Sequence, residues 1–391
     1  MKRIVALSPH LEHVDIFSGS FGCSIHFSSD YIGEYQRKQL FDVEPSPNTI
    51  KSFKSRGDEC WHEARDGILG SAIDVSKLEC LDVDHLYSGD EEWLRKYETT
   101  EPRLVVSDKM KQLSLEINSN DKEILHKIED FIASCYYLEK LELTGNVRSI
   151  PLSNVLMHHG EDLKILAIHE KESPTVEDQP GCTVAELDEI RHSCPNLEDI
   201  TIDTGKLSSA ESLHDVLSAL SRFPKLSVIR LYIPLGIAKT AAYTMHMFLD
   251  EEEQDIEKKQ HQDNPYSPLE DPHWLEYFWL VLKNQKTRYG TPQLRELHVK
   301  VGEWEREISG GGYPAAWILW ESSNRKYFIA KPVERDDKPD EIYVCERTSG
   351  QLNSKDIGEK TVKIPKMVGE HGSNPMSKLK KYARRLEDEI F

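Results

Sequence analysis

The sequence predicts an α/β fold made of stacked repeats, in which a short strand alternates with a returning helix. Three observations predict it: a six-residue apolar pattern recurs along the chain, helix-like stretches precede several copies, and 391 residues exceed one ordinary compact core. A strand with one helix cannot bury its apolar face alone, so neighbouring units must stack into a continuous core. The repeat therefore determines the architecture.

The recurring pattern is Leu-x-x-Leu-x-Leu, with apolar residues at positions one, four and six. Eight copies are clear, and a weaker ninth that begins at Ile50 has Ser55 at its last apolar position. The copies begin at Leu11, Ile50, Leu78, Met110, Leu138, Leu163, Leu197, Leu226 and Leu294. Six of the eight intervals between these residues are 25 to 34 residues long. An ordinary α/β domain with chance apolar pairs is the alternative, and eight copies in phase make it the weaker one.

Helix-like stretches stand before several copies, at residues 122–135 and 211–220. In the first stretch the apolar side chains recur at helical spacing, at Ile124, Leu125, Ile128, Phe131 and Ile132. Proline in Cys-Pro-Asn-Leu-Glu at 194–198 and in Phe-Pro-Lys-Leu at 223–226 ends the preceding helix. Together these features predict a leucine-rich-repeat solenoid of about nine repeats over residues 1–303.

One long interval, of 68 residues between Leu226 and Leu294, interrupts the repeat. Residues 250–272 within it begin with a run of Asp and Glu and are expected to form an acidic loop insertion. The following residues 274–282 predict a helix docked on the array. Its aromatic side chains are expected to pack in the core rather than to form a ligand-binding box.

After Lys300 the repeats stop, and residues 304–364 are predicted to form a C-terminal capping region. Short extended runs at 316–320, 326–329 and 341–345 would provide its strands. Such a cap is expected because the last repeat would otherwise expose an apolar face and an unpaired strand edge.

Both ends of the chain also carry predicted elements. Residues 365–391 form a tail in which 377–391 has an apolar stripe flanked by Lys and Arg. This stripe predicts a docked terminal helix, and contact with a membrane or a calmodulin-like partner is the alternative. Residues 1–7 resemble the end of a helix that leads into the first copy, which suggests a shortened array.

Composition and charge restrict the classes of partner. The hydrophobic share of 38% and charged share of 30% are typical of a soluble protein, and no apolar run approaches the roughly 20 residues of a membrane helix. Seven cysteines without paired spacing favour a reducing compartment, so a cytoplasmic or nuclear location is expected. The net charge of −19 argues against nucleic acid and anionic membranes as partners, because phosphates are bound by Lys and Arg.

No catalytic, nucleotide-binding or metal-binding motif occurs, so no enzyme activity, cofactor or metal is expected. The adjacent pair His158 and His159 lacks convergent further ligands, and a surface loop is the expected place for it. Cys135 and Cys194 are expected to pack where a helix leads into a strand. An enzyme that uses the region after Lys300 is the rival of another class, and it has no motif in its favour.

The predicted function is protein binding on the concave face of the strands. Side chains alternate along a strand, so if positions four and six are buried, then positions three, five and seven project. Four carboxylates would then form a contiguous acidic patch suited to a basic segment of the partner: Asp82, Asp84, Glu116 and Glu142. The alternative is that any solvated sheet of an acidic protein shows such carboxylates by chance.

A more apolar zone is predicted further along the same face, where an aromatic anchor of a partner could bind. Its residues would be Ile165, Ala167, Val228 and Tyr232, with His169 making the binding pH-dependent. Asp199, Asp203 and Arg230 complete the predicted set of partner-binding residues.

The repeat pattern, the Cys-Pro-Asn-Leu-Glu junction at 194–198 and the charged segment at 334–341 resemble intracellular F-box/leucine-rich-repeat proteins of filamentous fungi, over roughly residues 8–345. The resemblance implies a horseshoe like that of ribonuclease inhibitor, and substrate recruitment to a cullin-type ubiquitin ligase through its adaptor. No F-box motif is present, so the ligase role and the adaptor are expected only if an F-box is supplied upstream. A truncated or degenerate paralogue without independent activity is the alternative.

Overall fold

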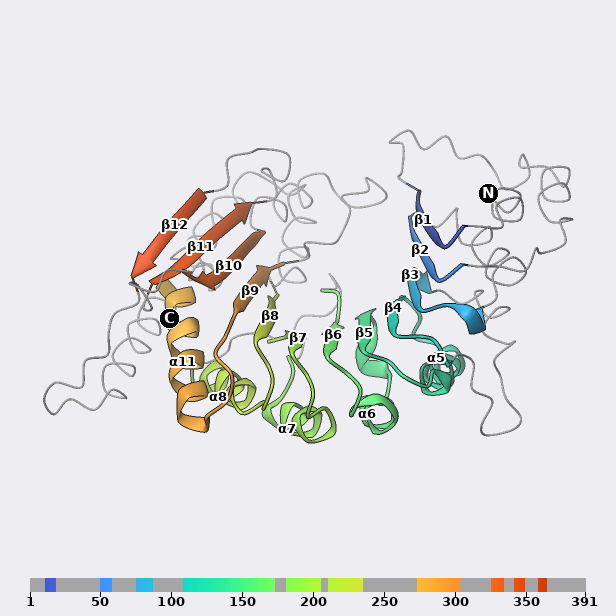
Figure 1. The fold of residues 1–391 in the computed structure, drawn as a ribbon, viewed down its shortest axis with the longest axis horizontal. Helices are drawn as coiled ribbons and strands as arrows, with labels where there is room; N and C mark the ends of the chain where they lie inside the picture. Colours follow the sequence, from blue (N-terminus) through green and yellow to red (C-terminus); the bar gives the residue numbers. More distant parts are fainter. Residues whose placement is uncertain are drawn as a thin grey trace, which may run out of the picture. The chain divides into compact units, whose positions relative to one another are not determined.

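The computed structural model describes the residues of ten segments: 11–18, 50–57, 75–86, 108–172, 181–204, 210–234, 273–302, 325–333, 341–348 and 358–363. The chain forms two compact units, Met1–Glu170 and Lys171–Phe391. Both are α/β, and most of their strands pair in parallel (Figure 1). The α/β class that the sequence predicts is therefore confirmed.

The first unit contains parallel strands that pair in chain order. These strands are β1 (His13–Ser18), β2 (Ser52–Gly57), β3 (Cys80–Leu86), β4 (Gln112–Ile117), β5 (Lys140–Gly145) and β6 (Ile165–His169). Its described helices are α5 (Lys122–Ser134) and α6 (Leu152–His159), with short 3-10 turns at Val75–Lys77 and Val147–Ser149. The weak ninth copy is thus a strand, β2.

The second unit begins in the same way and then changes direction. Strands β7 (Asp199–Asp203), β8 (Val228–Ile233) and β9 (Glu296–Val301) are parallel, with helices α7 (Val184–Ser193), α8 (Ala210–Ser221) and α11 (His273–Tyr289). Strands β10 (Lys326–Pro332), β11 (Glu341–Thr348) and β12 (Gly358–Lys363) continue the sheet in antiparallel pairs (Figure 1). The chain therefore covers the edge of β9 with strands of its own.

The strands pair so that equal positions of successive copies lie side by side. Leu113 of β4 pairs with Leu141 of β5, and Leu141 pairs with Leu166 of β6. The same holds between β8 and β9, where Ile229 pairs with Leu297. The predicted alignment of the copies is therefore confirmed within both units, apart from a register shift after Val83, where β3 meets β4.

Apolar residues of the repeat form the core. The starting residues of eight copies are almost completely buried: Ile50, Leu78, Met110, Leu138, Leu163, Leu197, Leu226 and Leu294. In α5 all five apolar residues of the predicted stripe are buried as well. Each such side chain contributes roughly 1.5 to 3 kcal/mol by leaving water, which explains why strand and helix need each other.

Local signals set where the helices begin and end. Asp121 caps α5 by accepting the backbone N–H of Glu123 at 2.9 Å, and Thr183 with Glu186 forms a capping box at α7. At the other ends, Cys135 and Cys194 are buried at the junctions to the next strands, as predicted. Burial raises the pKa of both thiols to about 12, so they remain protonated and act as packing residues.

Helix α11 extends the predicted helix 274–282 to residue 289. Phe278 and Trp279 are buried, which confirms the expected core packing. Lys286 was not predicted to have a role, yet it is fully buried and donates to the backbone carbonyl of Leu226 at 2.6 Å. Burial lowers the pKa of its amine to about 8.

The expectation of a surface loop at His158 and His159 is wrong. Both residues lie in the last turn of α6, and His159 is buried. Its Nε2–H donates to the carbonyl oxygen of Ile132, at the end of α5, at 2.8 Å. This carbonyl also accepts the backbone N–H of Cys135 at 3.1 Å, so the side chain of His159 fastens the end of α6 to the C-terminus of α5.

Charged residues alternate along one edge of the first unit, at position two of each copy. Two neighbouring pairs form salt bridges, Lys51 with Glu12 at 2.9 Å and Lys164 with Glu139 at 2.8 Å. The full series, here named the edge ladder, is Glu12, Lys51, Glu79, Lys111, Glu139 and Lys164. Opposite charges therefore meet across each pair of adjacent strands.

Several predicted elements lie outside the described residues. These are the run at 316–320, the acidic insertion at 250–272, the terminal helix at 377–391 and the helix end at 1–7. Two predicted runs of the capping region correspond to β10 and β11, whereas β12 was not predicted. Of the helices that the structure describes, none has the length and apolar character needed to cross a membrane.

Candidate protein-binding face

In each unit the described helices lie on one side of the strands, and we name the opposite side the open face (Figure 1). On β4 and β5 the side chains at positions four, six and eight are buried. Those at positions three, five and seven are half-buried or exposed, and they lie on the open face. The predicted alternation is therefore confirmed on these two strands.

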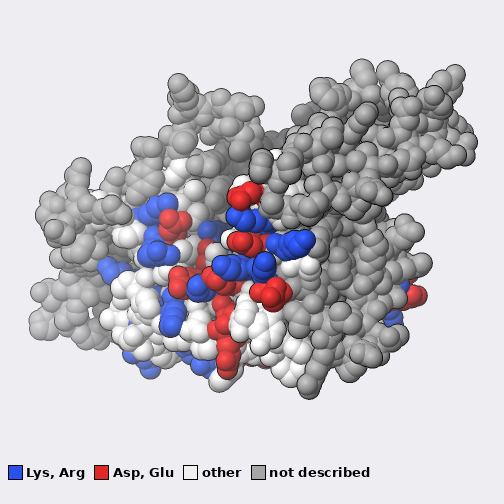
Figure 2. Space-filling view, turned by 45° about the vertical axis from the view of Figure 1, so that its right-hand side comes forward, with Lys and Arg blue, Asp and Glu red and all other residues white. Residues whose placement is uncertain are grey.

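The predicted acidic patch of the first unit is not contiguous. Asp82 is only 8% exposed, and in the register Ser114 separates it from Glu142. Lys54 lies beside Asp82 on β2, and Lys140 binds Glu142 at 3.0 Å. In the surface view, basic and acidic side chains are likewise interleaved (Figure 2).

The remaining two carboxylates of the patch also differ from the prediction. The register shift after Val83 removes the expected pairing of Asp84 with Glu116, and the side chain of Asp84 lies outside the described residues. Glu116 accepts a hydrogen bond from Asn118 Nδ2 at 3.0 Å. The apolar pattern of the copies could not reveal this irregularity, because a bulge changes the pairing of two strands without changing the pattern of either one.

The predicted apolar zone is divided between the units. Ile165 and Ala167 belong to the first unit, and Val228 and Tyr232 belong to the second. His169, the residue expected to make binding pH-dependent, is only 3% exposed. A partner would therefore not reach its imidazole from the open face, which corrects that expectation.

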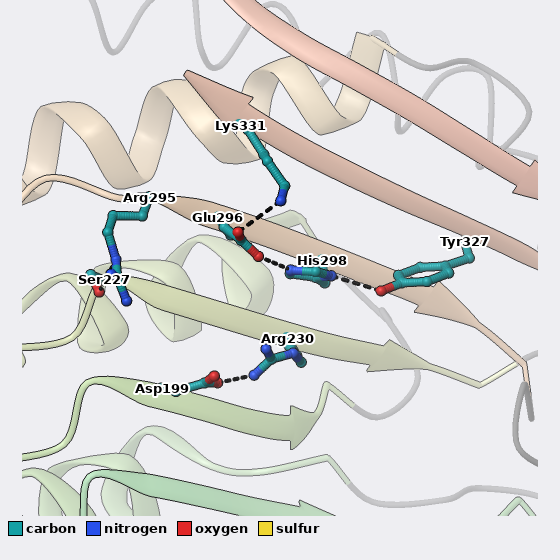
Figure 3. Close-up of polar contacts among 8 residues, drawn as sticks. All are labelled: Asp199, Ser227, Arg230, Arg295, Glu296, His298, Tyr327 and Lys331. Carbon is teal, nitrogen blue, oxygen red and sulfur yellow. Dashed lines mark hydrogen bonds and ion pairs between the residues drawn. The ribbon is translucent and has the colours of Figure 1, made fainter. Parts of the chain in front are cut away.

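On the open face of the second unit, polar side chains of β9 and β10 form one connected network (Figure 3). His298 of β9 contacts Glu296 of the same strand, Nε2 to Oε2, at 2.7 Å. Its other nitrogen, Nδ1, lies 2.7 Å from the hydroxyl of Tyr327 on β10. Lys331 of β10 donates to Oε1 of Glu296 at 2.8 Å. The network thus fastens β10 to β9 by side chains as well as by backbone.

The pKa shifts in this network have physical causes that agree with its geometry. Lys331 lowers the pKa of Glu296 by donating to the carboxylate, which remains ionised. Burial lowers the pKa of His298, although the contact with Glu296 opposes this effect. The imidazole is therefore neutral near pH 7, with Nε2–H donating to Glu296 and Nδ1 accepting the Tyr327 hydroxyl proton.

The neighbouring strands add further ion pairs and aromatic contacts. Arg230 of β8 donates to the carboxylate of Asp199 on β7. Lys300 of β9 donates to the Tyr232 hydroxyl at 2.6 Å and lies 4.6 Å from the centre of that ring. It also lies 5.7 Å from the centre of the Tyr327 ring. Charged and aromatic side chains therefore alternate across β7 to β10.

Several of the predicted residues are less exposed than expected. Asp203 is 8% exposed and Tyr232 is 5% exposed, although both were expected to project freely. Neighbouring strands lie only about 4.8 Å apart, so a long side chain such as Lys300 covers the residue beside it. Arg230 and Asp199 keep partial exposure, and the structure brings them together as predicted for one face.

Sequence reasoning did not place five residues of this face in the candidate site. Glu296, His298 and Lys300 occupy positions three, five and seven of the last copy, so the alignment could have identified them. Tyr327 and Lys331 carry no such signal, because β10 lies outside the repeat. Only its antiparallel pairing with β9 brings them onto this face.

The residues that the structure describes contain no cluster of His, Cys, Asp or Glu that could hold a metal ion. No model of a known protein family matches the chain, and no curated protein sequence matches it.

Proposed function

We propose that the chain is a leucine-rich-repeat solenoid of about nine repeats with a C-terminal cap, which binds a protein partner on its open face. The in-register pairing of equal positions supports the repeat architecture. Stacked repeats give an extended face whose backbone is regular while its side chains vary, which suits protein recognition.

The observation that carries the proposal is the composition of the open face on β7 to β10. Tyrosine and arginine, the residue types that dominate binding hot spots, lie there among partly exposed charges. Interfaces of this kind combine a buried aromatic centre with a polar rim that remains accessible to water. Tyr327, which is half-buried, corresponds to such a centre, and Arg230 and Lys331 correspond to the rim.

The ligase role implied by the resemblance is a conditional part of this proposal. It requires an F-box in addition to the repeats, and the adaptor would bind through that F-box. A reducing compartment such as cytoplasm or nucleus fits the described cysteines, which are all unbridged: Cys80, Cys135, Cys182, Cys194 and Cys345.

Affinity capture with the full chain tests the proposal. Wild-type protein is compared with Arg230→Ala/Tyr327→Ala, which alters the open face, and with Met157→Ala/Tyr289→Ala. The control pair removes exposed side chains from helices α6 and α11. We expect a partner whose recovery falls at least about tenfold with the first variant and is unchanged with the second.

Two outcomes would contradict this function. A partner that is lost only with the Met157/Tyr289 variant would bind the helical side. Recovery of chaperones alone would favour a truncated or degenerate paralogue, provided that the wild-type chain also aggregates in solution.

A further inference from the structure

Basic side chains are concentrated on one part of the open face of the second unit. On β8, β9 and β10 this face carries three cations and one carboxylate: Arg230, Lys300, Lys331 and Glu296. The whole chain has a net charge of −19. An excess of basic groups is therefore concentrated here against the overall charge, although Asp199 and Asp203 of β7 border it.

Two of the cations retain donors that could bind a further anion. Arg230 has five N–H donors, and the hydrogen bond found for it uses only Nη1, toward Asp199. Lys331 has three ammonium donors, of which one reaches Glu296. Their side chains are 31% and 47% exposed, so a carboxylate could approach either one without unfolding the network.

Between these cations lie two aromatic rings, an apolar side chain and the Glu296 carboxylate, which contacts both Lys331 and His298. The rings of His298 and Tyr327 stack with their centres 5.9 Å apart, and Ile329 pairs with His298 in the register. Because a cation lies on each side of this stack, the face fits a segment in which carboxylates flank an apolar or aromatic residue.

We propose that the open face of β8 to β10 binds an acidic peptide segment of the partner, with carboxylates on Arg230 and Lys331 and an apolar side chain over the His298–Tyr327 stack. This inference rests on the proposed function and names the chemistry of the partner. It replaces the basic segment that the first unit's carboxylates suggested.

Selection from a displayed library of random 12-residue peptides on the full chain tests this proposal. We expect the selected peptides to be enriched in Asp and Glu around an apolar residue. Fluorescence anisotropy with a selected peptide should then show weaker binding at higher salt, because the contacts are between charges near the surface.

Matched variants assign the binding to this face. Arg230→Gln/Lys331→Gln should weaken binding at least about tenfold, which corresponds to about 1.4 kcal/mol or more. Arg230→Glu/Lys331→Glu should abolish it. Lys54→Gln/Lys140→Gln removes the same charge from the open face of the first unit and should leave the affinity unchanged. Thermal unfolding followed by circular dichroism shows whether each variant is folded.

Several results would overturn the inference. They are the selection of basic peptides, of peptides without charge bias or of none at all, and equal losses in the two sets of folded variants. If affinity capture still recovers a partner that depends on the open face, the proposed function holds and only the acidic chemistry is wrong.

Discussion

The open faces of β4 to β6 and of β8 to β10 differ in chemistry, although β8 and β9 occupy the same positions of the repeat as β4 to β6. The first set consists of Gln112, Ser114, Glu116, Lys140, Glu142, Thr144, Ile165, Ala167 and His169. The second consists of Val228, Arg230, Tyr232, Glu296, His298, Lys300, Tyr327, Ile329 and Lys331. In the first set Lys140 is the one Lys or Arg and His169 has the one ring, whereas the second combines three cations with the rings of Tyr232, His298 and Tyr327. The backbone repeat therefore does not determine the binding properties of the face.

The two units also differ in how they place charge. In the first unit the edge ladder runs along exposed ends of strands, where water surrounds each ion pair. In the second unit position two holds Glu198, Ser227 and Arg295, and Arg295 donates instead to the Ser227 hydroxyl at 2.9 Å (Figure 3). Lys286 and His298 of the second unit are buried, so changes at these two residues should have larger effects on stability.

The largest effect is expected from Lys286. Its pKa in the folded state is about 8, below the value of about 10.4 in an unfolded chain, so the unfolded state binds more protons between these values. Below pH 8 the amine of Lys286 is protonated in both the folded and the unfolded chain, so burying its charge destabilises the folded state by the full amount. The wild type should therefore gain up to about 3 kcal/mol of stability as pH rises from 8 to 10.4.

Urea unfolding of the wild type and of Lys286→Met across this pH range measures that gain. The variant loses the hydrogen bond to Leu226 but has no amine to titrate. Its free energy of unfolding should therefore lack the gain that the wild type shows between these pH values. Parallel pH dependence of the two proteins would show that Lys286 is solvated rather than buried.

A smaller effect is expected from Tyr327→Phe, which removes the hydroxyl that donates to His298 Nδ1. The variant should lose roughly 0.5 to 1.5 kcal/mol in the free energy of unfolding at pH 7.5, the range of one hydrogen bond. Tyr137→Phe, which removes an exposed hydroxyl in the first unit, serves as the control. Equal losses in denaturant unfolding would mean that the network on β9 and β10 does not stabilise the second unit.

The smallest effect is expected from the edge ladder. Glu139→Lys would place three cations side by side, at positions 111, 139 and 164. Because these groups are exposed, the loss should be at most about 1 kcal/mol and should shrink in 1 M salt. Adding Lys111→Glu and Lys164→Glu should restore much of it. Thermal unfolding at low and high salt measures this loss of stability. A loss that is the same at both salt concentrations would exclude a charge effect.

Much of the fold was accessible from the sequence because the repeat is local. Leu113, Leu141 and Leu166 could be aligned by pattern alone, since a strand buries alternate residues and its neighbour repeats the requirement. The stripe of α5 and the junction cysteines followed for the same reason. Even the weak copy at Ile50 was recognisable, since Phe53 fills the position that pairs with Leu81.

The candidate site was less accessible, because binding chemistry depends on which side chains meet across strands. The acidic patch is interrupted by Lys140, which binds Glu142, and by the register shift after Val83. Lys140 lies two residues before Glu142 on the same face and could have been recognised, whereas the register shift leaves no mark in the pattern. The burial of His169 and Tyr232 depends on the bulk of their neighbours, which a one-dimensional alternation cannot express.

The sequence by itself determined the class of the fold, the strands of the repeat and their relative register. It could do so because apolar periodicity specifies which face of each element is buried. Only the tertiary structure decided that β10 pairs antiparallel with β9 and brings Tyr327 and Lys331 beside His298 and Glu296. Because β10 carries no copy of the repeat, its pairing is decided by packing and backbone hydrogen bonds, and these are properties of the folded chain alone.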